Sequence, residues 1–415
     1  MAAGALLPFI SVTAAMRVLA WALFDFANTF FAVTMLSFFF PLWITEDLGA
    51  KELWFSVSLG VSMAAVALVM PLCGAVSDAT QERMRFLRWS TYGCIAAVML
   101  VGMTSRLVPA LVLFGVANFC YQLGTIFYDA LLWRVSDARS LGRTSGVGSA
   151  FGYLGSMAGL LLLWPVVERG GRQASFLPSA LLFLVFALPS FLLIREPHAA
   201  GPLPWASLMR TAALRMAITV RQARGAGGAW TFLWAFFFSS NAINTVLVFM
   251  GIYAKKVLGL TEPEMIRFFV FSQAFAIAGA LSLSQLMPWC GPKRTLTLIW
   301  IGWISALGVL TFFHVGHGLW VIGPVFGFCL GGTWATSRVL IVQLSPKDQL
   351  AEMFGLAGLF GRASSILGPM LWGAIVWDPT RYQYATGMLM VLLAIGLSLL
   401  RRVAPLGSSA TEAIS

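Results

Sequence analysis

A chain of 415 residues that is 59% hydrophobic and only 10% charged cannot be a soluble globular protein, because no soluble domain of this size can hide that much apolar surface. The net charge of +11 would suit nucleic acid, but the basic residues gather in short loops on one side of the membrane, so topology explains the charge better. The composition predicts an all-α polytopic membrane protein whose surroundings are the lipid bilayer, with no nucleic-acid partner.

Twelve apolar runs are long enough to cross a bilayer. We expect them at 17–44, 53–76, 86–104, 109–133, 143–164, 176–194, 230–254, 265–287, 295–314, 319–344, 352–377 and 382–401. The longest polar interval, 195–229, is strongly basic and separates an N-terminal six-helix half, 1–194, from a C-terminal six-helix half, 230–401. Residues 402–415 form a tail.

Lysines and arginines predict the orientation. Most of the 27 basic residues fall in inner loops and tails if both termini are cytoplasmic, as positive-inside topology requires. The segment Met1 to Met16 has no basic region and no clear cleavage site, so we expect no removable signal peptide.

The two halves repeat in order. Met70-Pro-Leu-Cys-Gly74 recurs as Met287-Pro-Trp-Cys-Gly291, and two further matches pair Trp21 and Asn28 with Trp234 and Asn241, and Asp129 and Gly146 with Arg338 and Gly355. Six spans in each half give both halves the same orientation, so they are related by an axis along the membrane normal. Such a repeat predicts a central substrate site between the halves.

The loop after the second span contains Gly74, Asp78 and Arg83. Glycine lets helices approach closely, the aspartate can meet a helix N-terminus, and the basic residues hold the loop in the cytoplasm. This spacing resembles the major facilitator signature, in which the loop is a conformational latch; the alternative is an ordinary positive loop. The second half lacks the aspartate, so we expect a weaker second latch.

Other motifs carry a narrower resemblance. They are Phe24-Asp25-Phe-Ala-Asn28, Phe127-Tyr-Asp-Ala-Leu-Leu132, Gly142-Arg-Thr-Ser-Gly146, Gly152-Tyr-Leu-Gly155, Ser337-Arg338, Phe354 to Arg362, and Leu367-Gly-Pro369. Together they are similar to the major facilitator branch related to the fungal autophagy-linked vacuolar amino-acid effluxer, whose bacterial members long formed a group of unknown function. The sequence departs from that pattern at Asp129, Trp133 and Asn241, where asparagine, proline and an acid are expected.

The resemblance implies a secondary transporter in a bacterial inner membrane, and amino acids or short peptides are the first expectation for its substrate. Asp25 lies inside the first span, where a carboxyl group can carry a proton or bind a cation or amine. A permanent ion pair, or a local contact with Asn28, is the structural alternative.

Five uncharged polar residues complete the candidate substrate site: Asn28, Tyr121, Gln122, Asn241 and Asn244. Asparagine amides both donate and accept, which suits an amino or carboxyl group. Hydrogen bonding between helices is an equally good reading of the asparagines.

Two arginines lie inside apolar runs, where a charge is costly. The repeat pairs Arg338 with Asp129, so we expect these two to form an inner gate, unless each bonds locally. Arg362 we expect to bind helix carbonyls or a carboxylate. Reaching the headgroups is the alternative for both arginines.

No metal or cofactor is expected. His314 and His317 share a helix face, but no acid or cysteine accompanies them, and the five cysteines fit buried packing. The sequence contains no pattern that would bury a nucleophile beside a base, so we do not expect the protein to be an enzyme. The sequence thus favours a proton-coupled, monomeric transporter using alternating access. An uncoupled facilitator, a drug-like cation exporter and a non-transporting receptor remain alternatives.

Overall fold

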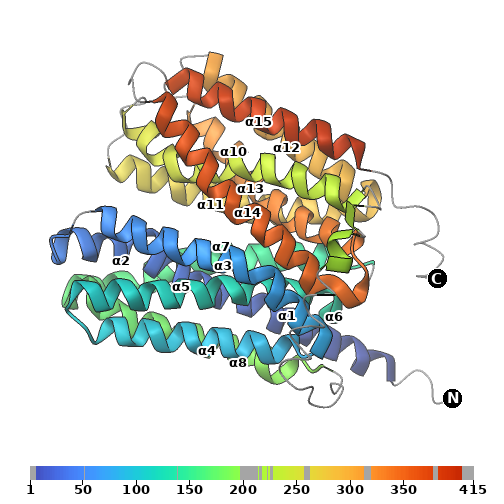
Figure 1. Ribbon diagram of the computed structural model, residues 1–415, viewed down its shortest axis with the longest axis horizontal. Coiled ribbons are helices and arrows are strands. Elements are labelled where there is room, and N and C mark those ends of the chain that lie inside the picture. The colour runs from blue at the N-terminus through green and yellow to red at the C-terminus, as the bar shows by residue number, and fades with distance from the viewer. Residues whose placement is uncertain are drawn as a thin grey trace. The chain divides into compact units, whose positions relative to one another are not determined.

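A computed structural model describes residues 6–50, 52–137, 139–196, 214, 217–221, 223–224, 228–256, 262–312, 319–376 and 382–403. Their regular structure is helical (Figure 1). The first half contains α1 (Leu6–Phe31), η1 (Ala32–Ser37), α2 (Phe39–Leu42), η2 (Trp43–Asp47), α3 (Glu52–Thr80), α4 (Arg83–Gly102), α5 (Leu107–Ala130), α6 (Leu132–Val135), α7 (Leu141–Gly170), η3 (Arg172–Ser175) and α8 (Phe176–Leu193). The second half contains α10 (Gly228–Lys256), α11 (Glu262–Cys290), α12 (Pro292–Phe312), α13 (Leu319–Gln343), η5 (Lys347–Gln349), α14 (Leu350–Ile375) and α15 (Tyr382–Arg402).

Within these residues, 11 helical stretches are long and apolar enough to cross a membrane. The twelfth predicted span is α4, a helix of 20 residues that carries Arg83, Arg85 and Arg88 in its first two turns. Those charges lower its hydropathy without shortening it. The chain is therefore an integral, multi-pass membrane protein. Most of the linker 195–229, and both His314 and His317, lie outside the described residues.

The first span is broken, which the uniform run 17–44 did not predict. Its middle is a π-helix, η1, where the Phe38 N–H donates to the Val33 carbonyl five residues earlier at 3.0 Å. Pro41 explains the break, because its ring has no N–H and clashes with the carbonyl four residues before it, that of Ser37. Thr34 inside η1 is buried and shares a hydrogen bond of 2.8 Å with Ser179 of α8.

The described residues pack into two compact units. The first unit draws on Met1–Asp137, Val147–Arg215 and Leu350–Gly355, and the second on Ala138–Gly146, Met216–Gln349 and Leu356–Ser415. The halves therefore exchange short helix ends: α7 begins in the second unit and α14 begins in the first. The two halves expected from the sequence, 1–194 and 230–401, stay a prediction.

Corresponding helices pack in the same pairs within each unit. In the first unit α4 contacts α5 and α8, as α12 contacts α13 and α15 in the second (Figure 1). Matching close approaches recur as well. A Cβ at Gly93 would lie 3.0 Å from the Cys120 sulfur, and one at Gly302 would lie 2.8 Å from the Cys329 sulfur. The internal repeat is thus present in three dimensions.

Candidate functional site

Asp25 lies in α1, inside the first membrane-spanning stretch, and is half-buried. Its carboxylate faces Gly152 of α7, where an added Cβ would be 3.1 Å from Oδ2. The absence of a side chain at Gly152 therefore makes room for the carboxylate. One turn earlier, Trp21 donates its indole N–H to the backbone carbonyl of Tyr128 at 3.0 Å. Its ring also stacks on the Tyr128 ring, with 4.5 Å between the ring centres. This contact fixes α1 against the end of α5.

The asparagines of α10 face α14. Asn244 donates its amide N–H to Ser365 Oγ at 2.9 Å, which is the helix-to-helix bond weighed as an alternative to substrate binding. Asn241 is 2% exposed, and its Oδ1 has no hydrogen-bond partner among the described residues. A Cβ at Gly368 would lie 2.6 Å from that oxygen. Asn28 of α1 is likewise buried.

Tyr121 and Gln122 lie on α5 but do different things. The Tyr121 ring stacks on Phe31 at 4.5 Å. Gln122 is buried and donates to Asn118 Oδ1 at 3.3 Å, while Asn118 donates to Ser62 Oγ of α3 at 2.7 Å. The Asn118–Ser62 bond joins α3 to α5, and the Gln122 bond lies within α5. The expected role of Gln122 in the substrate site stays a prediction.

The predicted latch residues form a buried ion pair. Asp78 Oδ1 accepts hydrogen bonds from Arg83 Nη2 at 2.6 Å and Arg83 Nε at 2.8 Å, and the side chains are 0% and 2% exposed. Asp78 Oδ2 accepts the backbone N–H of Glu352 at 2.9 Å, in the first turn of α14. The carboxylate thus satisfies an otherwise free helix N-terminal N–H and complements the positive end of the helix dipole.

Glu196 extends this cluster, although it was not among the predicted site residues. Its carboxylate accepts the backbone N–H of Met84 in the first turn of α4 at 2.6 Å. Burial raises the pKa of the Glu196 carboxyl group above its usual value, although the Met84 N–H and the guanidinium groups of Arg83 and Arg134 favour the ionised form. The start of the basic linker is thereby attached to the latch loop.

Glycines make the latch contact possible. A Cβ at Gly74 would lie 2.3 Å from the Ala351 carbonyl oxygen, and one at Gly355 would lie 2.9 Å from the Met70 carbonyl oxygen. Helix α3 therefore crosses the start of α14 with backbone against backbone. We call this the first crossing.

A second crossing lies within the second unit, where α11 meets the start of α7. A Cβ at Gly146 would lie 2.2 Å from Ser284 Oγ, and Gly142 packs against Met287. Beside it, Ser145 donates to the Ala335 carbonyl at 2.8 Å, and Arg338 Nη1 donates to Ser145 Oγ at 3.5 Å. Arg338 of α13 therefore contacts a side chain of α7. Its pairing with Asp129 stays a prediction.

Asp129 and Arg362 are both half-buried, on α5 and α14. One carboxylate oxygen of Asp129 and the Nε of Arg362 are enclosed by protein. Neither side chain is fully exposed, and the expected partner of Arg362 stays a prediction. Among the described residues, no three histidine, cysteine or acidic side chains are grouped as a metal site.

Comparison with known proteins agrees with this architecture. Residues 54–410 match the sequence model of the family described as vacuole effluxer Atg22 like. An uncharacterized MFS-type transporter, YxiO of Bacillus subtilis, is 22% identical over 92% of this chain and 93% of its own length. Autophagy-related protein 22 of Yarrowia lipolytica is 26% identical over 62% of this chain and 50% of its own length.

Solved structures resemble the fold. The human organic anion transporter MFSD10 (TETRAN) matches with a TM-score of 0.75 at 12% identity, covering 94% of this chain and 98% of that one. At this identity the likeness concerns the fold alone. The major facilitator fold expected from the internal repeat is confirmed.

Proposed function

The chain belongs to the Atg22-like vacuole effluxer family and is a membrane transporter of the MFS type; from this premise, we propose that it is a secondary active transporter that moves a small polar or amphipathic solute by alternating access. Amino acids and short peptides are the first solutes to consider, because the motifs of the chain resemble the branch related to a vacuolar amino-acid effluxer and the matched family is described as vacuole effluxer Atg22 like. We propose further that a proton drives the transport and that one chain is the functional unit.

The position of Asp25 is the observation that supports coupling most. It is a carboxylate in the first membrane-spanning stretch, set against the bare backbone of Gly152. An acid at such a depth is costly unless it serves a partner, a proton or a charged solute.

The two crossings support alternating access. The first turn of α14 belongs to the first unit and the rest of this helix to the second, and the reverse exchange occurs at α7. A rearrangement of the units has to release or strain these helix ends. Close glycine contacts, held at one end by the Asp78–Arg83 pair, are contacts that can form and break as a set.

Purified protein in proteoliposomes tests the proposal. Thermal stabilisation across the amino acids and a set of dipeptides selects candidate solutes. Vesicles loaded with a pH-sensitive dye then report proton movement when each selected solute is added. Wild-type protein should couple the two fluxes, whereas Asp25→Asn should retain solute exchange and lose proton movement and accumulation.

Asp348→Asn is the matched control, because it makes the same chemical change at an exposed aspartate. If Asp25→Asn accumulates solute as wild type does at all pH values, Asp25 is not the coupling residue. Solute flux without proton movement in wild type would support a facilitator. Selective stabilisation by lipophilic cations would favour a cation exporter, and no flux with any stabilising solute would favour a receptor.

The inner gate has its own test. We propose that Asp129 and Arg338 join when the cytoplasmic side is closed and part when it opens. Asp129→Arg should favour the inward-open form, and adding Arg338→Asp should restore the balance. Cysteine accessibility from the cytoplasm measures this, and strictly additive effects of the two changes would contradict the gate.

A further inference from the structure

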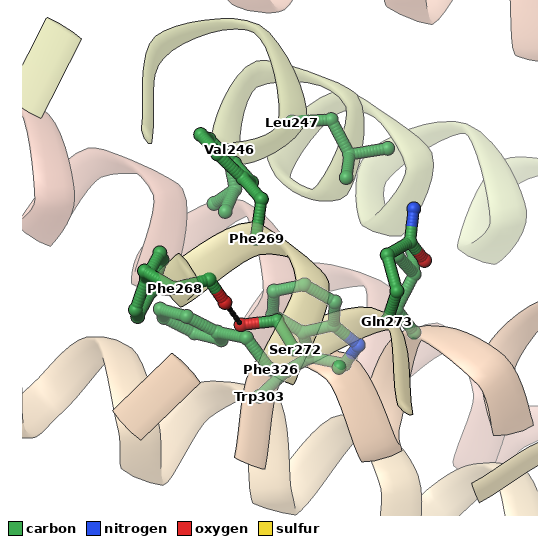
Figure 2. A pocket seen from close by; sticks show the side chains of 10 residues that line it. Val246, Leu247, Phe268, Phe269, Ser272, Gln273, Trp303 and Phe326 are labelled. Carbon is green, nitrogen blue, oxygen red and sulfur yellow. Dashed lines mark hydrogen bonds between the residues drawn. The ribbon is translucent and has the colours of Figure 1, made fainter. Parts of the chain in front are cut away.

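An apolar cavity of about 90 Å³ lies within the second unit, between α10, α11, α12 and α13 (Figure 2). None of the predicted site residues lines it. Its wall is made by Val246, Leu247, Phe268, Phe269, Ser272, Gln273, Trp303, Phe326, Gly327 and Leu330. No charged side chain is among them, so the cavity suits an uncharged and apolar occupant.

The polar groups of the wall are few and mostly engaged. The Ser272 hydroxyl donates to the Phe268 carbonyl of its own helix at 2.8 Å (Figure 2). The Trp303 indole N–H donates to Thr333 Oγ1 at 3.2 Å, away from the cavity wall. This leaves the Gln273 amide, which is half-buried at one side of the cavity.

Rigid packing holds the cavity open. A Cβ at Gly327 would lie 2.0 Å from the Ser272 carbonyl oxygen, so α11 and α13 already touch through their backbones and cannot close further. On the other side, the rings of Trp303 and Phe326 pack at 4.9 Å. An empty space of this kind deprives its lining of dispersion partners, and an apolar cavity does not hold water well.

The mouth of the cavity lies on an apolar surface of a membrane-spanning helix. Leu247 is 48% and Phe269 38% exposed, and α11 continues with exposed Val270, Phe271 and Phe275. These residues of α11 belong to the span Arg267–Cys290. Bilayer hydrocarbon is the abundant apolar medium around a membrane-spanning helix, and it consists of flexible chains thin enough to enter.

We propose that this cavity is a lipid site that holds the end of a hydrocarbon chain from a membrane phospholipid. Leaving one apolar medium for another brings no hydrophobic gain, so the chain is held by dispersion contacts with the rings and with Val246 and Leu330. A chain placed there supports α10 against α11 at a point where their side chains do not fill the space. The site does not depend on Asp25 or on proton coupling.

Brominated lipid tests the proposal, because bromine on an acyl chain quenches a tryptophan that it touches. Wild-type and Trp303→Phe proteins are reconstituted in phosphatidylcholine with plain or dibrominated acyl chains. Subtracting the fluorescence of Trp303→Phe from that of wild type gives the emission of Trp303, a side chain that is 1% exposed. We expect brominated chains to quench this emission. Val246→Phe, which fills the cavity, should abolish the quenching.

Val248→Phe is the matched control, since it adds the same ring two residues away on an exposed position of α10 outside the cavity. It should leave the quenching intact. Photo-crosslinking of the wild-type protein by a phosphatidylcholine with a diazirine near the chain end is a second measurement that needs no substitution of Trp303. Adducts should appear on the peptides carrying the cavity wall.

Three results would overturn the lipid site. They are unquenched Trp303 emission with no wall adducts, equal quenching in Val246→Phe and Val248→Phe, and relief of quenching by a water-soluble solute that the protein transports. The last result would make the cavity a solute subsite. All three are readable whether or not transport proves to be proton-coupled, so the two proposals fail separately.

Discussion

Both crossings rely on glycines that let two helices approach closely, but an ion pair stabilises only the first of these two crossings. At the first, α3 runs on past Gly74 to Thr80, and this extra turn carries Asp78 to the N-terminus of α14. At the second, α11 ends at Cys290, and Gly291 turns the chain at φ 79° directly into α12. The missing turn removes the place for an acid. Close approach is thus common to both crossings, whereas the ion pair is an addition to one.

The helices that follow the two crossings, α4 and α12, also differ in the charge that holds their first turn. In the first unit the acid Glu196, after α8, accepts an N–H of α4. In the second unit Lys293, in the first turn of α12, donates to the Arg401 carbonyl at 3.0 Å and to the Val403 carbonyl at the end of α15 at 2.5 Å. A base thereby complements the negative end of a helix dipole, where the first unit uses an acid at the positive end.

Removing the acid of the first crossing should have the largest effect. Asp78→Asn leaves Arg83 buried without its counter-charge, a change that costs about 3–5 kcal/mol in comparable buried pairs. Unfolding followed by heat and by denaturant in detergent measures the loss. Asp348→Asn should leave stability unchanged. A loss as small as that of the control would show that the ion pair does not secure the crossing.

A methyl group at the first crossing should have the next largest effect. Gly74→Ala places a Cβ 2.3 Å from the Ala351 carbonyl oxygen, which is backbone and cannot rotate away. We expect a loss of about 1–3 kcal/mol from overpacking. Gly60→Ala on the same helix has no atom within 4 Å and should stabilise by about 0.5–1 kcal/mol. Equal unfolding temperatures for these two variants would contradict the close contact.

The second crossing should be less sensitive to loss of a polar group. Ser145→Ala removes the 2.8 Å hydrogen bond to the Ala335 carbonyl, worth about 1 kcal/mol, together with the 3.5 Å contact from Arg338 Nη1, which is too long to add much. Ser156→Ala, which removes only a bond within α7, is the control. If Ser145→Ala destabilises as strongly as Asp78→Asn, the contrast between the crossings is wrong. The same unfolding assay ranks all of these variants.

The smallest effect concerns Glu196, and it depends on pH. Because the pKa of Glu196 is raised by burial, its protonated form is favoured in the folded protein. The corresponding stability is present below the unfolded pKa and is lost as pH rises through the folded pKa. Glu196→Gln keeps an oxygen for the Met84 N–H and removes this dependence. The variant should therefore gain stability relative to wild type as pH rises from about 4 to 8.

A difference between Glu196→Gln and wild type that shrinks over this pH range would contradict the burial effect. Glu82→Gln is the control, because it makes the same chemical change at an acid that contacts Arg85 at 2.9 Å nearer the surface.

The sequence predicts much of this molecule because its strongest signals are local. Apolar runs locate the spans, and the recurrence of Met70 to Gly74 as Met287 to Gly291 identifies the repeat. The motif that contains Gly74, Asp78 and Arg83 predicts an aspartate that meets a helix N-terminus. Asp25 is recognisable as an acid inside an apolar run.

What the sequence could not predict depends on distant backbone atoms. Glu196 looks like one acid in a basic linker, because its partner is an N–H 112 residues earlier. Ser145 looks like one small residue among many, and its acceptor is the carbonyl of Ala335. Pro41 is a readable signal of the broken first span, since a proline inside an apolar run favours a distorted helix, although Pro71 lies inside the continuous helix α3.

The exchanged helix ends also determine the order in which the protein can be completed during synthesis. Asp78 and Arg83 leave the ribosome early, but the backbone N–H that Asp78 accepts belongs to Glu352, which is made 274 residues later. Until then the carboxylate has its arginine but no helix N-terminus to meet. The first half can insert and pack its own helices, yet its last contacts await α14. A nascent chain stopped before residue 350 should therefore contain a first half that is assembled but more open to proteolysis at the loop around Gln81.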